Sequence, residues 1–341
     1  MNTRKPEDIN KNQGTIKYLD KHLEKGLLRV LTCGSVDDGK STLLGRLLYE
    51  TKAIFSDQLN QLKIDSKKFG TQGDSIDYAL LLDGLSAEQE QGITIDVAYR
   101  FFSTEKRKFI VADTPGHEQY TRNMATGAST ADAAIILIDA RKGLLAQTKR
   151  HSYLCQLLGI KHIIVAINKM DLIGYDEVQF LEITKEYKLF AKNIGIDKTS
   201  FIPISAINGD NVVSLSTNMK WYNQGSLLEL LENVDCENQD FRSQPFRMPV
   251  QLVNRPNADF RGVSGKSVSG YISVNDEIAV FPSGKKTKVK EIITPSGFVK
   301  VSSPAESITL TFSDEIDCSR GQILSSANAP LEMANQFETT I

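Results

Sequence analysis

Lys40 and Ser41 are the residues whose types and spacing point most clearly to chemistry. They end the stretch Gly34–Ser41, GSVDDGKS, which fits the pattern G-x-x-x-x-G-K-[ST] and lies between the apolar run Leu28–Cys33 and a helical pattern opened by Thr42. A strand, a glycine-rich loop and a helix in this order form a cradle of backbone N–H groups for a phosphate chain. In such a cradle the lysine reaches the β- and γ-phosphate oxygens, and the serine hydroxyl is a Mg²⁺ ligand.

Glycine-rich turns also join strands to helices without binding anything, but the fit of both the letters and their context favours a triphosphate site. The predicted phosphate-binding residues are Gly34, Ser35, Val36, Asp37, Asp38, Gly39, Lys40, Ser41 and Thr42.

A carboxylate, Asp113, directly follows the predicted strand Lys108–Ala112 and precedes Thr114, Pro115 and Gly116. In nucleotide-hydrolysing α/β domains this is the place of an outer-sphere Mg²⁺ ligand, and the Gly116 N–H is available to the γ-phosphate. Asp-x-Pro-Gly alone is also a common turn. Because the same domain carries the phosphate-binding stretch, the sequence favours the functional interpretation.

Asn168, Lys169, Met170 and Asp171 follow another predicted strand, His162–Ile167. The Asp171 carboxylate can accept two N–H donors, from N1 and the exocyclic N2 of guanine, and adenine lacks this pair. Asn168 can bond the other edge of the base, and the Lys169 stem can lie over the ring. Asx-rich stretches are also common helix caps, but the position after a strand favours a guanine site.

Apolar runs of strand length alternate with helical patterns through this part of the chain, which predicts a doubly wound, mostly parallel sheet. The predicted strands are Leu28–Cys33, Val97–Phe102, Lys108–Ala112, Ala133–Asp139, His162–Ile167 and Phe201–Ile204. The predicted helices are one within Thr15–Lys25, one opened by Thr42, one carrying Tyr120, Met124 and Ala128, Gln147–Leu158, Glu177–Asn193, and one carrying Leu227, Leu230 and Leu231 that ends near Glu232. Ser205 and Ala206 follow the last strand, where a backbone N–H could contact the guanine carbonyl oxygen.

After Pro245 the apolar period changes from that of a helix to that of a strand, which predicts a small all-β barrel. The predicted strands are Met248–Val253, Ser267–Val274, Glu277–Phe281, Lys288–Ile293 and Ser307–Phe312. We therefore expect a polar tail and short helix over 1–26, a nucleotide-binding domain over 27–240 and a barrel over 244–330. The barrel region has no metal-ligand spacing or nucleophile–base pair, so we expect it to serve contact or positioning.

Composition excludes several classes of function. A net charge of −2 and a pI near 6.2 argue against a nucleic-acid partner held mainly by phosphate contacts. Cys33, Cys155, Cys236 and Cys318 form no C-x-x-C pair, so neither a disulfide framework nor a thiolate metal site is indicated. The N-terminal segment has no apolar signal core and the apolar runs are too short to cross a membrane, so we expect a cytoplasmic protein with no membrane partner.

The three motifs together resemble those of the translational-type GTPases. The resemblance extends to Gln91-Gly92-Ile93-Thr94, to His117 after D-T-P-G and to Gln147-Thr148-Lys149-Arg150-His151. Within that superfamily, Thr32–Leu43, Asn254–Gly262 and Asp314–Gly321 are similar to the GTPase subunit of bacterial sulfate adenylyltransferase. The resemblance covers nearly all of residues 15–330.

The resemblance implies an α/β P-loop GTPase domain followed by a small β-barrel, with GTP and Mg²⁺ as ligands. It also implies a partner, the catalytic (small) subunit of sulfate adenylyltransferase, bound as a heterodimer or in a higher assembly. GTP hydrolysis would then drive the formation of adenosine 5′-phosphosulfate and pyrophosphate from ATP and sulfate on that partner.

Three roles come from the resemblance alone. Thr94 would be the switch threonine that ligates Mg²⁺ and senses the γ-phosphate, His117 would orient the attacking water, and Val36 would be an apolar gate near that water. We therefore expect Lys40, Thr94 and His117 to be catalytic and Ser41, Thr94 and Asp113 to hold the metal.

The sequence departs from the family in two places. Gln89 stands where the family usually has an arginine between two glutamates, and 331–341 would be the first strand of a second barrel into which the family continues. Two other functions stay open. One is an elongation-factor-like translational GTPase, against which Asp38 counts because elongation factor Tu has a histidine there; the other is a nucleotide-dependent scaffold with little turnover.

Overall fold

The computed structural model describes residues 25–54, 56–69, 76–81, 94–235, 239–257, 260–332, 334, 336 and 338 of the 341-residue chain. The chain divides into two compact units, Met1–Cys236 and Glu237–Ile341. The predicted N-terminal helix, apart from Lys25, lies outside the described residues, as do Gln89, residues 91–93 and much of 331–341.

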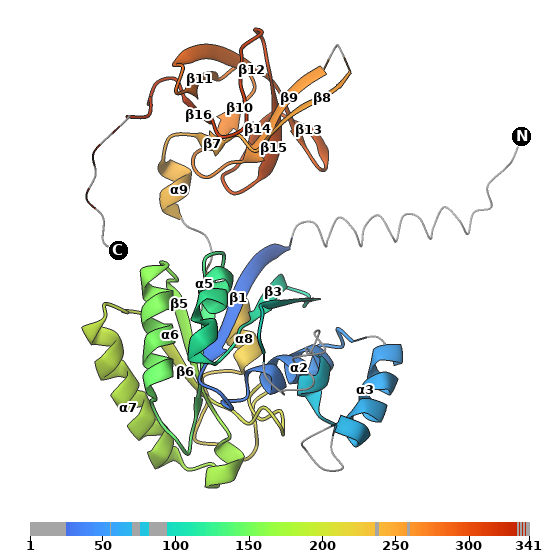
Figure 1. The fold of residues 1–341 in the computed structure, drawn as a ribbon, viewed down its shortest axis with the longest axis vertical. Helices are drawn as coiled ribbons and strands as arrows, with labels where there is room; N and C mark the ends of the chain where they lie inside the picture. Colours follow the sequence, from blue (N-terminus) through green and yellow to red (C-terminus); the bar gives the residue numbers. More distant parts are fainter. Residues whose placement is uncertain are drawn as a thin grey trace, which may run out of the picture. The chain divides into compact units, whose positions relative to one another are not determined.

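A six-stranded sheet forms the centre of the first unit, in the order β2-β3-β1-β4-β5-β6 (Figure 1). Its strands are β1 (Gly26–Gly34), β2 (Ala98–Ser103), β3 (Arg107–Asp113), β4 (Ala133–Asp139), β5 (His162–Asn168) and β6 (Thr199–Pro203). Neighbouring strands are parallel except β2, which is antiparallel to β3. Every residue of β4 is buried, as expected of a strand covered on both faces. The predicted doubly wound α/β fold is confirmed.

Helices border this sheet. They are α2 (Lys40–Glu50), α3 (Ser56–Phe69), α5 (Thr121–Ala128), α6 (Ala146–Leu157), α7 (Glu177–Asn193) and α8 (Leu227–Glu232), with 3-10 turns η1 (Tyr78–Leu81), η2 (Glu118–Tyr120) and η3 (Met170–Ile173). Figure 1 shows α5, α6 and α7 on one side of β1 and α2 on the other. On α2, the buried residues Leu43, Leu44 and Leu47 follow helical spacing and form the face that packs on the sheet.

Helix α3 was not predicted. Among the side chains of α3 that the structure describes, Leu62 and Ser66 are buried, and the surrounding stretch is rich in Asp, Gln, Ser and Gly. The polar composition of Ala53–Gly92 therefore concealed a helix.

The parallel strands bring the predicted motifs together. In a parallel sheet all carboxyl ends lie at one edge, and here β1, β3, β4, β5 and β6 run in the same direction. The loops that follow these strands carry the phosphate-binding stretch, the Asp113 turn, the segment after Asp139, the Asn168 motif and Ser205–Ala206. One edge of the sheet therefore holds the candidate site.

The second unit is mainly antiparallel. Its strands are β7 (Arg247–Pro249), β8 (Leu252–Asn257), β9 (Phe260–Lys266), β10 (Ile272–Ser273), β11 (Glu277–Phe281), β12 (Lys285–Thr294), β13 (Gly297–Val299), β14 (Val301–Ser302), β15 (Ser307–Phe312) and β16 (Ile323–Ser326), with the short helix α9 (Gln239–Ser243). The larger sheet has the order β7-β16-β11-β12-β15-β9-β8, and β7 also contacts β9. The sheet therefore curls until its two ends meet, as in a barrel.

Two predicted strands of this unit are wrong in detail. Met248–Val253 is divided between β7 and β8, and most of Ser267–Val274 is not a strand. The strand that precedes it in the chain, β9, contains Gly262 and Gly265, which lower strand propensity. Gly265 is required there because a Cβ would lie 2.3 Å from the carbonyl oxygen of Pro249. Glycine at a close backbone approach therefore hid a strand from the sequence pattern.

Candidate functional site

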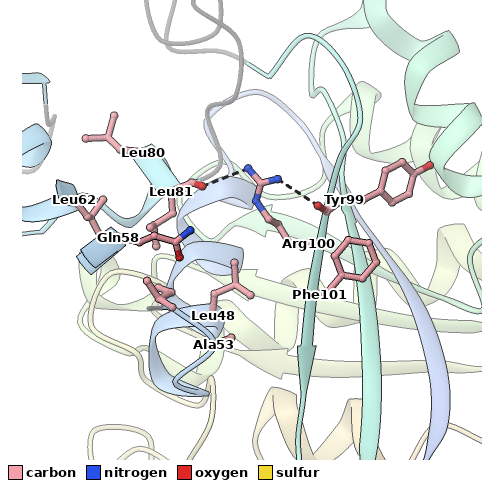
Figure 2. Close-up of a pocket in the computed structure, with 10 residues that line it drawn as sticks. Leu48, Ala53, Gln58, Leu62, Leu80, Leu81, Tyr99, Arg100 and Phe101 are labelled. Carbon is pink, nitrogen blue, oxygen red and sulfur yellow. Dashed lines mark hydrogen bonds between the residues drawn. The ribbon is translucent and has the colours of Figure 1, made fainter. Parts of the chain in front are cut away.

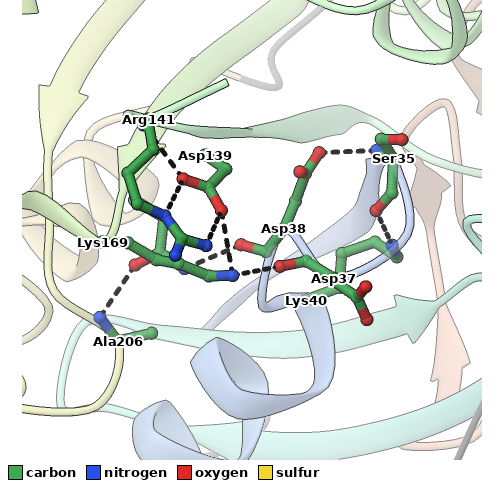
Figure 3. Close-up of polar contacts among 9 residues, drawn as sticks. Ser35, Asp37, Asp38, Lys40, Asp139, Arg141, Lys169 and Ala206 are labelled. Carbon is green, nitrogen blue, oxygen red and sulfur yellow. Dashed lines mark hydrogen bonds and ion pairs between the residues drawn. The ribbon is translucent and has the colours of Figure 1, made fainter. Parts of the chain in front are cut away.

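The phosphate-binding stretch forms a closed loop between β1 and α2. The Lys40 ammonium donates to the carbonyl oxygens of Ser35 at 2.6 Å and Gly34 at 3.4 Å, so it lies within the loop (Figure 3). Lys40 is buried, and burial lowers the pKa of its ammonium while the nearby Asp113 and Asp38 carboxylates oppose that shift. The loop therefore holds one buried cation at the point where a phosphate chain is expected.

Gly39 is needed for the turn into α2. Its φ is +89°, in the left-handed region, and a Cβ would lie 2.5 Å from the side-chain nitrogen of Asn168. Both the conformation and the close approach exclude larger residues.

The other predicted residues of this stretch differ in exposure. Ser35, Val36 and Thr42 are half-buried, and Asp37 is exposed with a φ of +63°.

Asp38 is a buried carboxylate inside this loop. Its Oδ2 accepts the N–H of Ser35 at 2.6 Å, whereas its Oδ1 is buried and has no hydrogen-bond partner among the described residues. Burial raises the pKa of the Asp38 carboxyl and the Asp139 carboxylate adds to this, while Lys40, the Ser35 N–H and Lys142 oppose it. An orphaned buried acceptor is costly in a folded protein, so it marks this loop as incomplete without a partner.

Ser41, Thr94 and Asp113 come together although they lie far apart in the sequence. The Ser41 hydroxyl donates to Asp113 Oδ2 at 2.9 Å and lies 3.4 Å from the Thr94 hydroxyl. Asp113 Oδ1 accepts from the Thr32 hydroxyl at 2.9 Å, so the carboxylate is fixed between β1 and α2. Burial raises the pKa of Asp113, while Lys40 and the two hydroxyl donors oppose that shift.

These oxygens fit a magnesium ion. Mg²⁺ is usually held by few protein oxygens together with phosphate oxygens and water. Among the described residues, no group of three or more His, Cys, Asp or Glu side chains is placed to hold a metal by itself. Among the described residues, the hydroxyls of Ser41 and Thr94 beside the Asp113 carboxylate therefore suit Mg²⁺.

The Asp113 turn lies directly on the phosphate loop. Thr114 donates through its hydroxyl to the carbonyl of Thr32 at 2.6 Å, and Pro115 is buried. At Gly116 a Cβ would lie 2.5 Å from the Lys40 ammonium and 2.9 Å from the Ser35 carbonyl oxygen, so only glycine fits. His117 follows, half-buried with extended backbone, and its ring meets that of Tyr120 edge-on at 6.4 Å.

Asn168 joins two loops of the site. Its side-chain nitrogen donates to the Asp38 carbonyl oxygen at 2.8 Å, and its Oδ1 accepts the N–H of Ala206 at 2.9 Å. The N–H of Ser205 donates to the carbonyl of Asp210 at 3.2 Å. In this structure the amide of Asn168 and the two N–H groups therefore bond protein atoms. Asn168 still has a second N–H and a second lone pair, so its predicted contact with the base stays a prediction.

The Lys169 side chain connects the phosphate loop to the end of β4. Its backbone is left-handed, with a φ of 65°, and its ammonium contacts the Asp37 carbonyl oxygen and the Asp139 carboxylate, the latter at 3.0 Å (Figure 3). Asp139 is buried at the end of β4 and also accepts the Arg141 guanidinium, at 3.0 and 2.6 Å. Burial alone would raise the Asp139 pKa, but the hydrogen bonds from Arg141 and Lys169 hold it far below its usual range.

Asp139 and Arg141 are functional candidates that sequence reasoning missed. An Asp at the end of a buried strand was available as a signal, since Asp113 was identified in that way. Asp139 is not followed directly by Pro-Gly as Asp113 is, so the sequence indicates only the end of a strand there.

Asp171 lies half-buried in η3, next to the buried Met170, whose N–H donates to the carbonyl of Ile204 at 3.2 Å. No described residue donates a hydrogen bond to the Asp171 carboxylate, although Arg141 is close enough to interact with it electrostatically. Both carboxylate oxygens of Asp171 therefore stay available to donors from a ligand.

A separate cavity of about 520 Å³ lies away from these motifs, between α2, α3, η1 and β2 (Figure 2). Its lining is largely apolar and contains none of the predicted site residues. Tyr99 and Phe101 line it from β2.

The N-terminal part of the chain matches a known family. Residues 25–237 match the family described as "Elongation factor Tu GTP binding domain". The chain is 56% identical over 324 residues to sulfate adenylyltransferase subunit 1 of Colwellia psychrerythraea. The matched residues make up 95% of this chain and 69% of the relative. The chain belongs to the sulfate adenylyltransferase subunit 1 family.

Other members of this family are similarly close. The subunit 1 of Aliivibrio fischeri is 57% identical over 330 residues, covering 96% of this chain and 69% of the relative. The subunit 1 of Salmonella arizonae is 57% identical over 335 residues, covering 98% and 70%. The family predicted from the motifs is confirmed.

Solved structures support the fold. The GTPase-like domain of Ski7 from S. cerevisiae, bound to GDP and inorganic phosphate, has a TM-score of 0.57 at 20% identity and covers 92% of this chain and 77% of that one. The same domain bound to GTP has a TM-score of 0.55 at 21% identity, covering 91% and 76%. Among the described residues, none of the helices has the length and apolar character that crossing a bilayer requires.

Proposed function

We propose that this chain binds and hydrolyses GTP as the regulatory subunit of a sulfate adenylyltransferase, and that hydrolysis drives adenylylsulfate formation on a catalytic partner subunit. The observation that carries the proposal is the meeting of three groups at one edge of the sheet. These are the loop around Lys40, the oxygens of Ser41, Thr94 and Asp113, and the free carboxylate of Asp171.

The base and the phosphates have distinct places in this proposal. The Asp171 carboxylate accepts N1–H and N2–H of guanine, which selects GTP over ATP. The loop N–H groups and the helix dipole of α2 bind the phosphate chain, with Lys40 moving from the loop carbonyls to phosphate oxygens. Asn168 acts mainly by holding the phosphate loop against Ser205–Ala206, as its two bonds to Asp38 and Ala206 suggest.

Ser41 and Thr94 would hold Mg²⁺, and Asp113 would orient the Ser41 hydroxyl through their 2.9 Å hydrogen bond. When bound, the ion neutralises charge on the β- and γ-phosphates. Asp113 thus acts on the metal site through Ser41. Its Oδ1 accepts from the Thr32 hydroxyl, which keeps the Asp113 carboxylate in position.

His117 would orient the water that attacks the γ-phosphate. Gly116 lies against Lys40 and Ser35, so a γ-phosphate beside Lys40 also lies beside Gly116. The presence of that phosphate would order the segments around Thr94 and Gly116–His117, and its loss would release them. We expect the partner subunit to bind these two states with different affinity, since only differential affinity can couple hydrolysis to its reaction.

Co-purification with the catalytic subunit tests the proposal. The complex should form adenylylsulfate from ATP and sulfate faster with GTP than without it. GDP and a non-hydrolysable GTP analogue are the controls, because a drive that comes from hydrolysis is absent with both.

Three outcomes would contradict parts of the proposal. Equal rates of adenylylsulfate formation with and without GTP would show that GTP hydrolysis is not coupled to that reaction. Stimulation by the analogue equal to that by GTP, with no phosphate released, would identify a nucleotide-dependent scaffold. Co-purification of tRNA in place of a catalytic subunit would favour a translational GTPase.

A further inference from the structure

His151 lies behind the phosphate loop and bonds it directly. Its Nδ1 accepts the backbone N–H of Gly34 at 3.1 Å, at the point where β1 ends and the loop begins. The side chain comes from α6, in the stretch Gln147–His151, and has no exposed area. A buried N–H that finds its acceptor on another element fixes the position of its backbone segment.

A hydrogen bond accepted at Nδ1 requires the neutral form of the His151 ring. Burial lowers its pKa to about 4, and the nearby positive charges of Lys40 and Arg150 act in the same direction. Because Nδ1 accepts a hydrogen bond, the single proton of the neutral ring is on Nε2. His151 is therefore an acceptor toward the loop and a donor on its other side.

Gln147 faces that donor side. The side-chain nitrogen of Gln147 lies 2.9 Å from His151 Nε2, and Gln147 Oε1 accepts from the Arg150 guanidinium at 3.0 Å. In this orientation of the amide, two nitrogens that both carry hydrogen face each other. The oxygen and the nitrogen point in different directions from the planar amide, so turning the oxygen toward the His151 N–H turns the NH2 group toward Arg150, and only one of the two donors is satisfied at a time. Arg150 in turn contacts the Glu118 carboxylate at 2.8 Å, and Glu118 adjoins His117.

We propose that His151 is a positioning residue for the phosphate loop and that His151 and Arg150 compete for the side-chain amide of Gln147. When the Gln147 oxygen turns to His151, it fixes the ring and with it the Gly34 N–H. When it turns to Arg150, the ring loses its second bond and the loop is held less firmly. The inference rests on the proposed function, because its readout is nucleotide release. It links the loop to the segment that carries His117.

Release of a fluorescent GDP analogue, measured by stopped flow, tests the first half. His151→Leu leaves the buried Gly34 N–H without an acceptor, and we expect release to be about 10- to 100-fold faster. His151→Asn keeps an acceptor oxygen near the position of Nδ1, and we expect it to restore most of the wild-type rate.

Ser152→Ala is the matched control. Ser152 is buried on the same helix and accepts from the Tyr187 hydroxyl at 2.9 Å. Its loss destabilises α6 without touching the loop, so release should stay near wild type. If His151→Leu releases GDP no faster than Ser152→Ala, or if His151→Asn is as fast as His151→Leu, the positioning role is refuted. If the unmodified chain binds no GDP at all, the proposed function fails instead.

A double-mutant cycle tests the competition. Arg150→Met removes the competing donor and should slow GDP release about two- to fivefold, and the same substitution in a Gln147→Met background should have no effect. A simple loss of positive charge would instead speed release in both backgrounds, and that result would overturn the shared amide.

Discussion

The Lys169 ammonium lies 3.0 Å from the buried carboxylate of Asp139 and also contacts the carbonyl oxygen of Asp37. This single side chain therefore joins the ends of β4 and β5 to the phosphate loop. The motif that offers Asp171 for a base and the loop that receives phosphates are fixed relative to each other through it. Binding of the two ends of one nucleotide requires this spacing to be constant.

Asp139→Asn should weaken this junction. The substitution replaces two charge-assisted hydrogen bonds with weaker ones and leaves Lys169 without its carboxylate, so we expect the unfolding free energy to fall by about 2–3 kcal/mol. Nucleotide affinity should fall with it. Arg141→Met is the control, because Arg141 is half-exposed and its loss should cost less than about 1 kcal/mol. Denaturant unfolding of both variants measures the difference, and equal losses would show that Lys169 does not depend on Asp139.

His117→Ala should slow GTP hydrolysis by about 10²- to 10⁴-fold and leave GTP affinity near wild type, because the ring acts on water and not on the nucleotide. Single-turnover phosphate release and equilibrium titration measure the two quantities. His162→Ala is the matched control, since His162 is half-buried at the opposite end of the sheet, where β5 begins. Weaker binding with unchanged hydrolysis would make His117 structural.

Asp38→Asn should stabilise the nucleotide-free protein. Burial raises the folded-state pKa of Asp38, so the unfolded chain ionises first as pH rises above about 4, and stability falls until the folded carboxyl ionises too. Near neutral pH the buried carboxylate, whose Oδ1 has no described partner, costs about 1–2 kcal/mol in its charged form, and asparagine carries no charge. Thermal unfolding should show a larger gain at pH 8 than at pH 4.

Asp37→Asn serves as the control for that measurement. Asp37 is the exposed neighbour of Asp38, and its left-handed backbone suits asparagine as well as aspartate. We expect no gain from it. A gain equal to that of Asp38→Asn would attribute the effect to net charge and not to burial.

His151 should make stability depend on pH in the opposite direction. Its folded-state pKa of about 4 lies below the ordinary value near 6.5, so the unfolded chain takes up a proton first as pH falls. Its contribution is fully present above pH 6.5 and is lost progressively down to about pH 4, by about 3 kcal/mol. His151→Asn should flatten the stability curve in this window. An unchanged slope would show that the ring is not buried as a neutral group.

Most residues of the candidate site could be predicted because parallel strands end at the same edge of the sheet. Motifs that follow such strands in the sequence therefore lie close together. Asp113, Asn168 and Asp171 were found because each directly follows, or lies close after, an apolar strand. Thr94 and His117 needed the family resemblance, since neither has a local signal of its own. Asp139 was missed because no recognised motif follows it and its contact with Lys169 joins two distant parts of the sequence.

Elements were missed where glycine or polar residues serve tertiary packing. Strand β9 contains Gly265, which a close backbone approach requires, and α3 lies in a stretch of polar composition. In β9, local propensity gave no strand signal because a distant contact, with Pro249, determines which residue fits there.

The nucleotide preference of Asp171→Asn shows whether guanine binds at the end of β5. Asp171 lies half-buried with a carboxylate that no described residue uses in a hydrogen bond, and we propose that it accepts the two N–H donors of guanine. Equilibrium titration should show that the wild-type chain prefers GTP to xanthosine triphosphate and that the variant reverses this preference. Unchanged preference for GTP in a folded variant would show that Asp171 does not bind the base.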